Sequence, residues 1–103
     1  MWHTPSQEKL DEIPRLYETD DIAIENVQIY LHFYIYGCDW FVSEFDGIDR
    51  FYGYVILNQD SVNSEWGYFS FQELKAININ AVEICCDTEW SIRPVSKIEK
   101  IQL

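Results

Sequence analysis

Three carboxylates surround Gly47, where the chain leaves a predicted strand and turns: Glu44, Asp46 and Asp49. Carboxylates grouped on one loop are the ligands that Ca²⁺ and Mg²⁺ prefer. This group has too few ligands for an EF-hand loop, and the closing glutamate of that loop is missing. The competing interpretation is structural, because an aspartate in a turn can fix the turn by accepting hydrogen bonds from nearby backbone. We favour the structural interpretation and expect neither a metal ion nor another cofactor.

A second pair of carboxylates, Glu44 and Glu65, lies on predicted strands beside aromatic residues, a combination that sugar-binding sites also use. Glycoside hydrolysis needs two carboxyl groups held about 5 to 9.5 Å apart, one of them with a raised pKa. A chain of 103 residues leaves little room for the necessary cleft. We therefore predict no catalytic residue. The alternative hypothesis is a small hydrolase or metal-dependent enzyme that uses Glu44, Asp46 and Glu65.

The three cysteines have no spacing typical of a metal site, and their odd number fits a reducing compartment. A catalytic thiol would need a nearby histidine, and the sequence contains only His3 and His32. Neighbouring Cys85 and Cys86 point to opposite sides of a predicted strand, so we expect one in the core and the other directed outward.

Acidic residues dominate the charge of the chain. Asp and Glu number 18 and Lys and Arg number 7, which gives a formal net charge of −11, and no Lys or Arg lies between Arg15 and Arg50. Binding of phosphate requires a basic surface, so we expect no direct contact with nucleic acid and none with an anionic membrane. We predict a basic protein partner, for instance a nucleic-acid-binding protein whose groove normally receives phosphate. In the alternative interpretation, the carboxylates only keep an aromatic-rich domain soluble.

The longest apolar runs fall well short of the roughly 18 residues of a membrane-spanning helix. Residues 1–4 show no basic start followed by an apolar segment, so we expect no signal peptide and a cytoplasmic location. The oligomeric state stays open.

Aromatic residues make up 17% of the chain and are interleaved with carboxylates. Tyr and Trp supply contact area in protein interfaces, and acids favour basic partners, so this mixture is typical of a protein-binding face. Alternatively, the rings fill the two sides of a small sheet. The predicted partner-binding residues are Glu18, Asp20, Asp21, Glu25, Tyr34, Tyr36, Asp39, Trp40, Glu44, Asp46 and Asp49.

The elements that position these residues follow from periodicity and capping signals. A short helix begins after Ser6 and stops near Ile13 because Pro14 follows. Strict alternation predicts a strand over residues 26–36, and further strands follow at 40–45, 51–57 and 65–70. Ser70 and Glu73 form a capping box for a helix over residues 71–77. Residues 82–86 and 90–93 form two more short strands, or one strand and a loop. We predict one α+β domain, residues 1–103, with a small twisted antiparallel sheet of four to six strands, arranged as a meander, and a short helix near each end.

Three segments resemble one uncharacterised family. They are W-F-V-S-E-F-D-G from Trp40 to Gly47, F-Y-G-Y-V from Phe51 to Val55, and E-W-G-Y-F-S-F-Q-E-L from Glu65 to Leu74. Together with Leu16-Tyr17, they are similar to motifs of domain-of-unknown-function family 2958, which occurs in bacteria, plasmids and phages. The resemblance covers about residues 10 to 97. The tail departs from the family pattern, because Cys85-Cys86 stand where a more polar segment is expected.

This resemblance implies no activity, cofactor or catalytic residue, but it does imply a short accessory protein of a mobile element. Small acidic proteins of such elements often block host defence nucleases, and the resemblance extends this association to the present chain by analogy. We therefore predict a non-enzymatic protein-binding module that inhibits a host defence protein or another nucleic-acid-binding protein. Such an inhibitor, of anti-CRISPR or anti-restriction type, would act by steric block or DNA mimicry. A third hypothesis is an assembly subunit of a larger complex.

Overall fold

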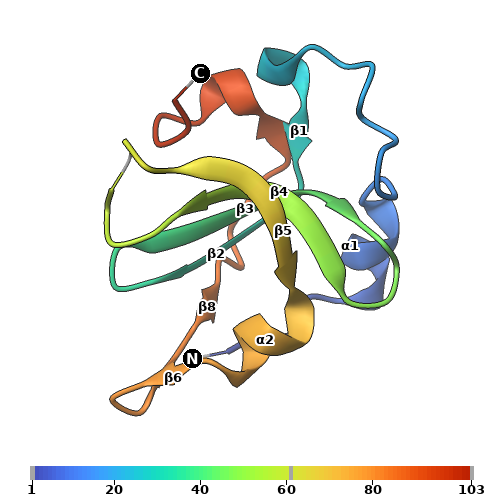
Figure 1. Ribbon diagram of the computed structural model, residues 1–103. Helices are drawn as coiled ribbons and strands as arrows, with labels where there is room; N and C mark the ends of the chain where they lie inside the picture. The colour runs from blue at the N-terminus through green and yellow to red at the C-terminus, as the bar shows by residue number, and fades with distance from the viewer. Residues whose placement is uncertain (1, 61, 103) are drawn as a thin grey trace.

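A five-stranded antiparallel sheet forms the centre of the computed structural model, which describes residues 2–60 and 62–102 (Figure 1). The strand order is β5-β4-β3-β2-β8. Strands β2 to β5 are neighbours both in the chain and in the sheet, so the predicted α+β class and antiparallel meander are confirmed. The bounds are β2 Leu31–Ile35, β3 Cys38–Phe45, β4 Arg50–Ile56, β5 Glu65–Ser70 and β8 Cys85–Cys86.

Shorter elements surround this sheet. Strand β1 pairs with β9, and β6 pairs with β7 in a separate two-stranded hairpin. The second α-helix follows β5, while the C-terminal end carries a 3-10 turn, η2. The bounds are α1 Gln7–Glu12, η1 Ile24–Asn26, β1 Gln28–Ile29, α2 Phe71–Ala76, β6 Asn78–Ile79, β7 Val82–Glu83, β9 Arg93–Pro94 and η2 Val95–Lys97.

Both α-helices begin at a serine that caps them. The Ser6 hydroxyl accepts a hydrogen bond from the Lys9 N–H at 3.2 Å, and the Ser70 hydroxyl accepts one from the Glu73 N–H at 3.1 Å. Each cap satisfies one of the N–H groups that have no partner within the helix. Helix α1 ends at Glu12, before Pro14, as the sequence predicts. None of the helices in residues 2–60 and 62–102 is long and apolar enough to cross a membrane.

The predicted strand over residues 26–36 is two strands in the structure. Its alternation is confirmed, because every second residue from Val27 to Ile35 is buried. Tyr30 interrupts the pairing: its N–H still donates to the Val42 carbonyl at 2.8 Å, but the residues before it pair with β9 instead of remaining in the five-stranded sheet. This change of partner depends on a segment more than 60 residues away, which local alternation does not encode.

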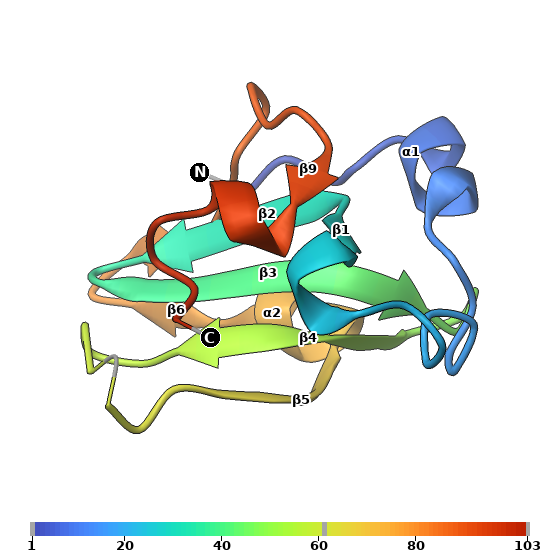
Figure 2. The same cartoon turned by 90° about the horizontal axis from the view of Figure 1, so that it is seen from above.

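Two apolar cores lie on the two sides of the sheet. In Figure 2, η1, β1, β9 and η2 lie on the viewer's side of β2 and β3, and α2 lies behind the sheet. The first core includes Phe33, Trp40, Phe51 and Leu74 of α2. The second core joins the sheet to the C-terminal segment and contains Val27, Ile29, Phe41, Tyr54, Ile56, Val95, Ile98 and Ile101.

A β-bulge in β3 changes which side chains reach each core. The register with β4 shifts between Val42, which lies opposite Gly53, and Glu44, which lies opposite Tyr52. Ser43 is the extra residue, and its hydroxyl donates to the Tyr52 carbonyl at 3.0 Å. Residues directly opposite in a sheet share a face. The bulge therefore moves Glu44 to the Tyr52 face of the sheet, and the next residue, Phe45, enters the first core.

Candidate functional site

Asp46 and Asp49, both predicted to contact a partner, organise the turn and the helix around them. One oxygen of Asp46 accepts hydrogen bonds from the N–H groups of Ile48, Asp49 and Arg50, at 2.7, 2.8 and 3.0 Å. Burial alone would raise the pKa of Asp46, but these three donors outweigh it and lower the pKa below its ordinary value. The structure thus shows the turn-fixing role that the sequence favoured over a metal site.

Asp49 holds the start of α2. Its carboxylate accepts hydrogen bonds from the Ser70 hydroxyl at 2.6 Å and from the Gln72 N–H at 2.8 Å, and its carbonyl accepts one from the Phe71 N–H at 2.8 Å. Reversing the charge of Asp46 or Asp49 would disturb this turn and cap. Neither residue therefore provides a clean test of binding.

Glu44 is buried, which corrects its prediction as a contact residue. Its side chain accepts hydrogen bonds from the N–H groups of Tyr17 and Thr19, at 3.0 and 3.1 Å, and from the Thr19 hydroxyl. Tyr17 has a positive φ of 72°, so the chain turns sharply here. The carboxylate satisfies the backbone donors of that turn and is not available to a partner at the surface.

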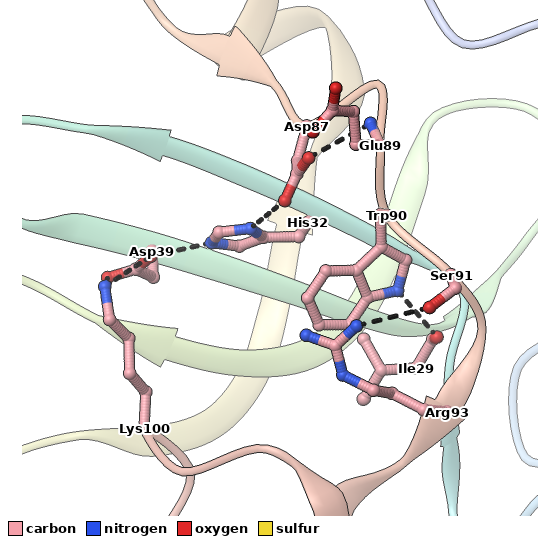
Figure 3. A network of polar contacts seen from close by, with 9 residues as sticks. All are labelled: Ile29, His32, Asp39, Asp87, Glu89, Trp90, Ser91, Arg93 and Lys100. Carbon is pink, nitrogen blue, oxygen red and sulfur yellow. Dashed lines mark hydrogen bonds and ion pairs between the residues drawn. The ribbon is translucent and has the colours of Figure 1, made fainter.

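Asp39 and Trp40 are also buried, which corrects their prediction as contact residues. The Asp39 carboxylate accepts hydrogen bonds from His32 Nε2 at 2.7 Å and from Lys100 Nζ at 3.2 Å (Figure 3). The other ring nitrogen of His32 lies 3.2 Å from the Asp87 carboxylate. Trp40 packs in the first core. The two residues tie the start of β3 to the rest of the fold and cannot anchor a partner.

Tyr34 and Tyr36 are exposed, at 43% and 59%, but they lie at the other end of the sheet from the acidic loop. Tyr36 belongs to the turn before β3, whereas the loop around Tyr17 is held by Glu44, near the last residue of that strand. The structure therefore does not bring these two tyrosines together with the acidic residues 18–25. The predicted binding residues fall into separate groups.

Four of the predicted residues, all in the segment between α1 and β1, remain exposed: Glu18, Asp20, Asp21 and Glu25. Asp20 lies on the rim of a hollow of about 240 Å³, lined also by Ile22, Ile24, Val27, Tyr52 and Trp66. Ile22 and Ile24 are 45% and 44% exposed, so apolar surface lies among the carboxylates. We call this region the acidic–aromatic surface; it comprises Glu18, Asp20, Asp21, Ile22, Ile24, Glu25, Tyr52 and Trp66.

Two aromatic rings form the sheet side of this surface. The Tyr52 and Trp66 rings lie with centroids 6.0 Å apart, and Tyr68 follows 5.0 Å from Tyr52. Burial and the negative charges of Glu44 and Asp20 raise the pKa of Tyr52. A hydrogen bond with the Tyr17 side chain raises the pKa of Tyr68 to about 12. These phenols stay neutral near pH 7, so they offer contact area and hydrogen bonds without adding charge.

Tyr52 and Trp66 lie on strands that the sequence predicts, but they are not among the predicted binding residues. Alternation shows that Tyr52, Tyr54, Trp66 and Tyr68 share one sheet face, because β4 and β5 pair with Tyr52 opposite Tyr68 and Tyr54 opposite Trp66. It does not show which loop crosses that face. The Glu44 contacts bring residues 17–19 to it, and the bulge directs Glu44 there.

The enzyme hypothesis receives no specific support from the placement of its carboxylates. The Glu44 carboxylate accepts hydrogen bonds from residues 17–19, and the Asp46 carboxylate accepts them from the backbone of its own turn. Glu65 is exposed at the start of β5. Within the described part of the chain, no group of three or more His, Cys, Asp or Glu side chains is arranged to hold a metal ion.

Comparison of the chain with protein-family models, curated proteins and solved structures finds no match. The resemblance to domain-of-unknown-function family 2958 therefore stays a prediction.

Proposed function

We propose that the protein is a non-enzymatic module that binds a basic protein through the acidic–aromatic surface. One observation carries the proposal: Asp20 lines an apolar hollow that has Tyr52 and Trp66 on its sheet side, and the exposed Glu18, Asp21 and Glu25 lie in the same segment of chain. A role in solubility alone would not require a carboxylate beside an apolar hollow. Its two exposed isoleucines are the type of apolar surface that a partner covers.

Charge and apolar contact area would contribute to binding in different ways. The carboxylates attract a basic partner over a distance, which raises the association rate. The isoleucines and aromatic rings then supply area that is removed from water. The Arg15 guanidinium donates to the Phe45 carbonyl at 3.4 Å and lies 6.0 Å from the centre of the Phe45 ring, and among the described residues it forms no ion pair with the loop carboxylates.

The partner that fits this surface best is a nucleic-acid-binding protein. A nucleic-acid-binding protein carries a basic groove shaped for phosphate, and an acidic surface with apolar anchors fits such a groove. The resemblance to a mobile-element family favours a host defence protein, inhibited by steric block or by DNA mimicry in the manner of anti-CRISPR or anti-restriction proteins. The hydrolase and assembly-subunit hypotheses remain alternatives that no particular contact favours.

Two variants of equal net charge test the surface. The loop variant combines Asp20→Lys, Asp21→Lys and Glu25→Lys, and the control variant combines Glu12→Lys, Glu89→Lys and Glu99→Lys. All six side chains are exposed. Each protein is immobilised and exposed to a nuclease-treated bacterial lysate at low salt. The captured protein is then purified, and its dissociation constant is measured against both variants.

We expect the wild type and the control variant to retain a basic nucleic-acid-binding protein that added duplex DNA displaces. We expect the loop variant to bind this protein at least about tenfold more weakly than the wild type does. We also expect the affinity of the wild type for it to fall as the salt concentration rises. Equal loss in both variants would show that only net charge matters and would overturn the proposed surface. Failure of the wild type to retain any such protein would overturn the proposed function.

A further inference from the structure

Strand β5 has a free edge. It pairs with β4 on one side, and among the described residues no strand pairs with its other side. The six residues pair with β4 without a register shift, and they include no proline, lysine or arginine. Natural edge strands are commonly protected by such residues or by bulges, because an open edge can pair with another chain. The edge of β5 lacks these protections.

The alternation of hydrogen bonds between β4 and β5 identifies the backbone groups of β5 that point to the free edge. The pair Arg50 and Ser70 ends the β4–β5 ladder, and the same register places Asp49 opposite Phe71. The Phe71 N–H donates to the Asp49 carbonyl at 2.8 Å, so this next position is a hydrogen-bonded one. In antiparallel strands such positions alternate. Phe69, Gly67 and Glu65 therefore bond to β4, whereas Trp66 and Tyr68 direct their backbone N–H and C=O groups to the free edge. No hydrogen bond from residues 2–60 or 62–102 reaches these outward groups.

Two hollows flank this edge and meet at Tyr68. The first, of about 370 Å³, lies over Gly67, where a Cβ atom would meet nothing within 4 Å. Val55 and Leu57 give it an apolar lining, and Asp60 is also part of its lining. The second hollow, of about 510 Å³, is lined by Asp49, Arg50, Tyr68, Phe69, Ser70 and Glu73. Side chains of an added strand would therefore find room beside β5.

The charges along the edge specify the occupant. The described residues that line the two hollows include four carboxylates, Asp49, Asp60, Glu65 and Glu73, against one cation, Arg50. A second copy of this chain would bring another net charge of −11 to the same place, so pairing of two copies is disfavoured. A basic segment has the complementary charge.

The geometry points to β-augmentation: the free edge of β5 binds an extended, basic segment of the partner protein as a sixth strand of the sheet. The Trp66 and Tyr68 backbone groups pair with the added strand. One aliphatic side chain of that strand occupies the space over Gly67, and Lys or Arg two residues away lies near Glu65 and Asp60. Backbone pairing supplies affinity and the hollow supplies selectivity, as in other strand-addition complexes. This inference rests on the proposed function for the basic character of the partner.

The probe is the peptide acetyl-Lys-Thr-Val-Thr-Lys-Thr-amide, which presents lysine, valine and lysine on one face when extended. Its control has proline in place of the first two threonines, with the same charge but without two backbone donors. Binding is followed by nuclear magnetic resonance through the amide signals of residues 65–70. We expect the first peptide to bind at least about tenfold more tightly than the proline peptide and to shift the Trp66 and Tyr68 amides. Equal affinity of the two peptides would overturn the inference.

Two substitutions at one position separate the backbone from the side chain. Tyr68→Pro removes an outward N–H without removing a hydrogen bond to β4, and proline is tolerated at such edge positions. Tyr68→Ala removes the ring and keeps the N–H. We expect Tyr68→Pro to bind the first peptide at least about tenfold more weakly than Tyr68→Ala; equal binding would overturn the inference. If Tyr68→Pro does not fold, the two peptides still decide the question on the wild-type protein.

The partner captured from the lysate distinguishes failure of this inference from failure of the proposed function. Loss of that partner in the loop variant but not in Tyr68→Pro would overturn the edge contact alone. Retention of that partner by both variants would overturn both proposals.

Discussion

Asp39 and Glu44 are buried carboxylates of one strand, and each holds a segment that is distant in the chain. Asp39 binds Lys100, 61 residues away, and Glu44 binds the turn at residues 17–19. A buried charge is stable only when its hydrogen-bonding capacity is satisfied. No buried side-chain nitrogen or oxygen in the described residues lacks a hydrogen-bond partner. Asp39 and Glu44 therefore stabilise the fold that holds the exposed carboxylates of residues 18–25 at the surface.

Low pH should destabilise the fold, because it protonates the Asp39 carboxylate. Burial alone would raise the pKa of Asp39, but hydrogen bonds from His32 and Lys100, and the positive charge of Lys100, lower it below its ordinary value. The ordinary aspartate pKa is about 3.9, so this stabilisation is fully present well above pH 4 and is lost as pH falls through the lower folded-state pKa. We expect Asp39→Asn to reduce the free energy of unfolding by roughly 2 kcal/mol at pH 6. That difference should shrink below about pH 4.

Urea denaturation between pH 2.5 and pH 7 measures this effect. Asp21→Asn, on the exposed loop, is the control and should change the free energy of unfolding by less than about 0.5 kcal/mol. A difference between wild type and Asp39→Asn that stays constant across this pH range would contradict the role assigned to the Asp39 carboxylate.

Residue type alone could not separate structural acids from exposed ones. Glu44 and Glu65 both follow or precede aromatic residues on predicted strands, yet one is buried and the other exposed. The difference arises from the bulge at Ser43 and from the loop that crosses Glu44. The role of Asp46 could be predicted, because an aspartate next to glycine in a turn bonds to backbone donors within a few residues.

At the scale of elements, the close approach of β3 and β4 depends on Gly53. A Cβ atom there would lie 1.8 Å from the Phe41 carbonyl oxygen and 3.1 Å from Val42 Cα. These are backbone atoms of the neighbouring strand and cannot move aside as a flexible side chain can. The glycine permits the approach beside the bulge that directs Glu44 and Phe45 to opposite faces.

Gly53→Ala should therefore be strongly destabilising. We expect a loss of more than about 3 kcal/mol in the free energy of unfolding, because strands β3 and β4 must separate locally. Gly67→Ala, on the next strand, adds the same methyl group where nothing lies within 4 Å and should change stability by less than about 1 kcal/mol. Thermal and urea unfolding compare the two. Similar losses in both variants would contradict the close-approach argument.

Elements with local signals could be predicted from the sequence. The sequence patterns predicted β3 to β5 within about one or two residues, and Ser70 with Glu73 predicted α2. The break at Tyr30 and the pairing of β1 with β9 could not be predicted, because they depend on contacts between distant segments. The arrangement of residues 17–25 over β4 and β5 has the same origin.

At the scale of the whole molecule, most of the negative charge lies on the surface. Twelve of the 18 acidic residues are exposed, at positions 8, 11, 12, 18, 20, 21, 25, 60, 65, 73, 89 and 99. Positive charge is concentrated near the C-terminus, where Arg93, Lys97 and Lys100 line one hollow. Repulsion between the exposed carboxylates opposes compaction of the chain.

Salt should therefore stabilise the free protein. Ions screen repulsion over about 10 Å at 0.1 M, so we expect the melting temperature to rise by a few degrees between 10 and 150 mM sodium chloride. The variant Asp20→Asn, Asp21→Asn, Glu25→Gln carries less repulsion and should show a smaller rise. Differential scanning calorimetry measures both. A melting temperature independent of salt would contradict significant repulsion.

The second core also determines when the chain can complete its fold during synthesis. Val95, Ile98 and Ile101 cover the face formed by Val27, Ile29 and Phe41, and all three come after the strands of the sheet in the chain. A ribosome therefore makes these residues after the face that they cover. Until residues 95–101 have left the ribosome, the growing chain carries one apolar side of its sheet uncovered.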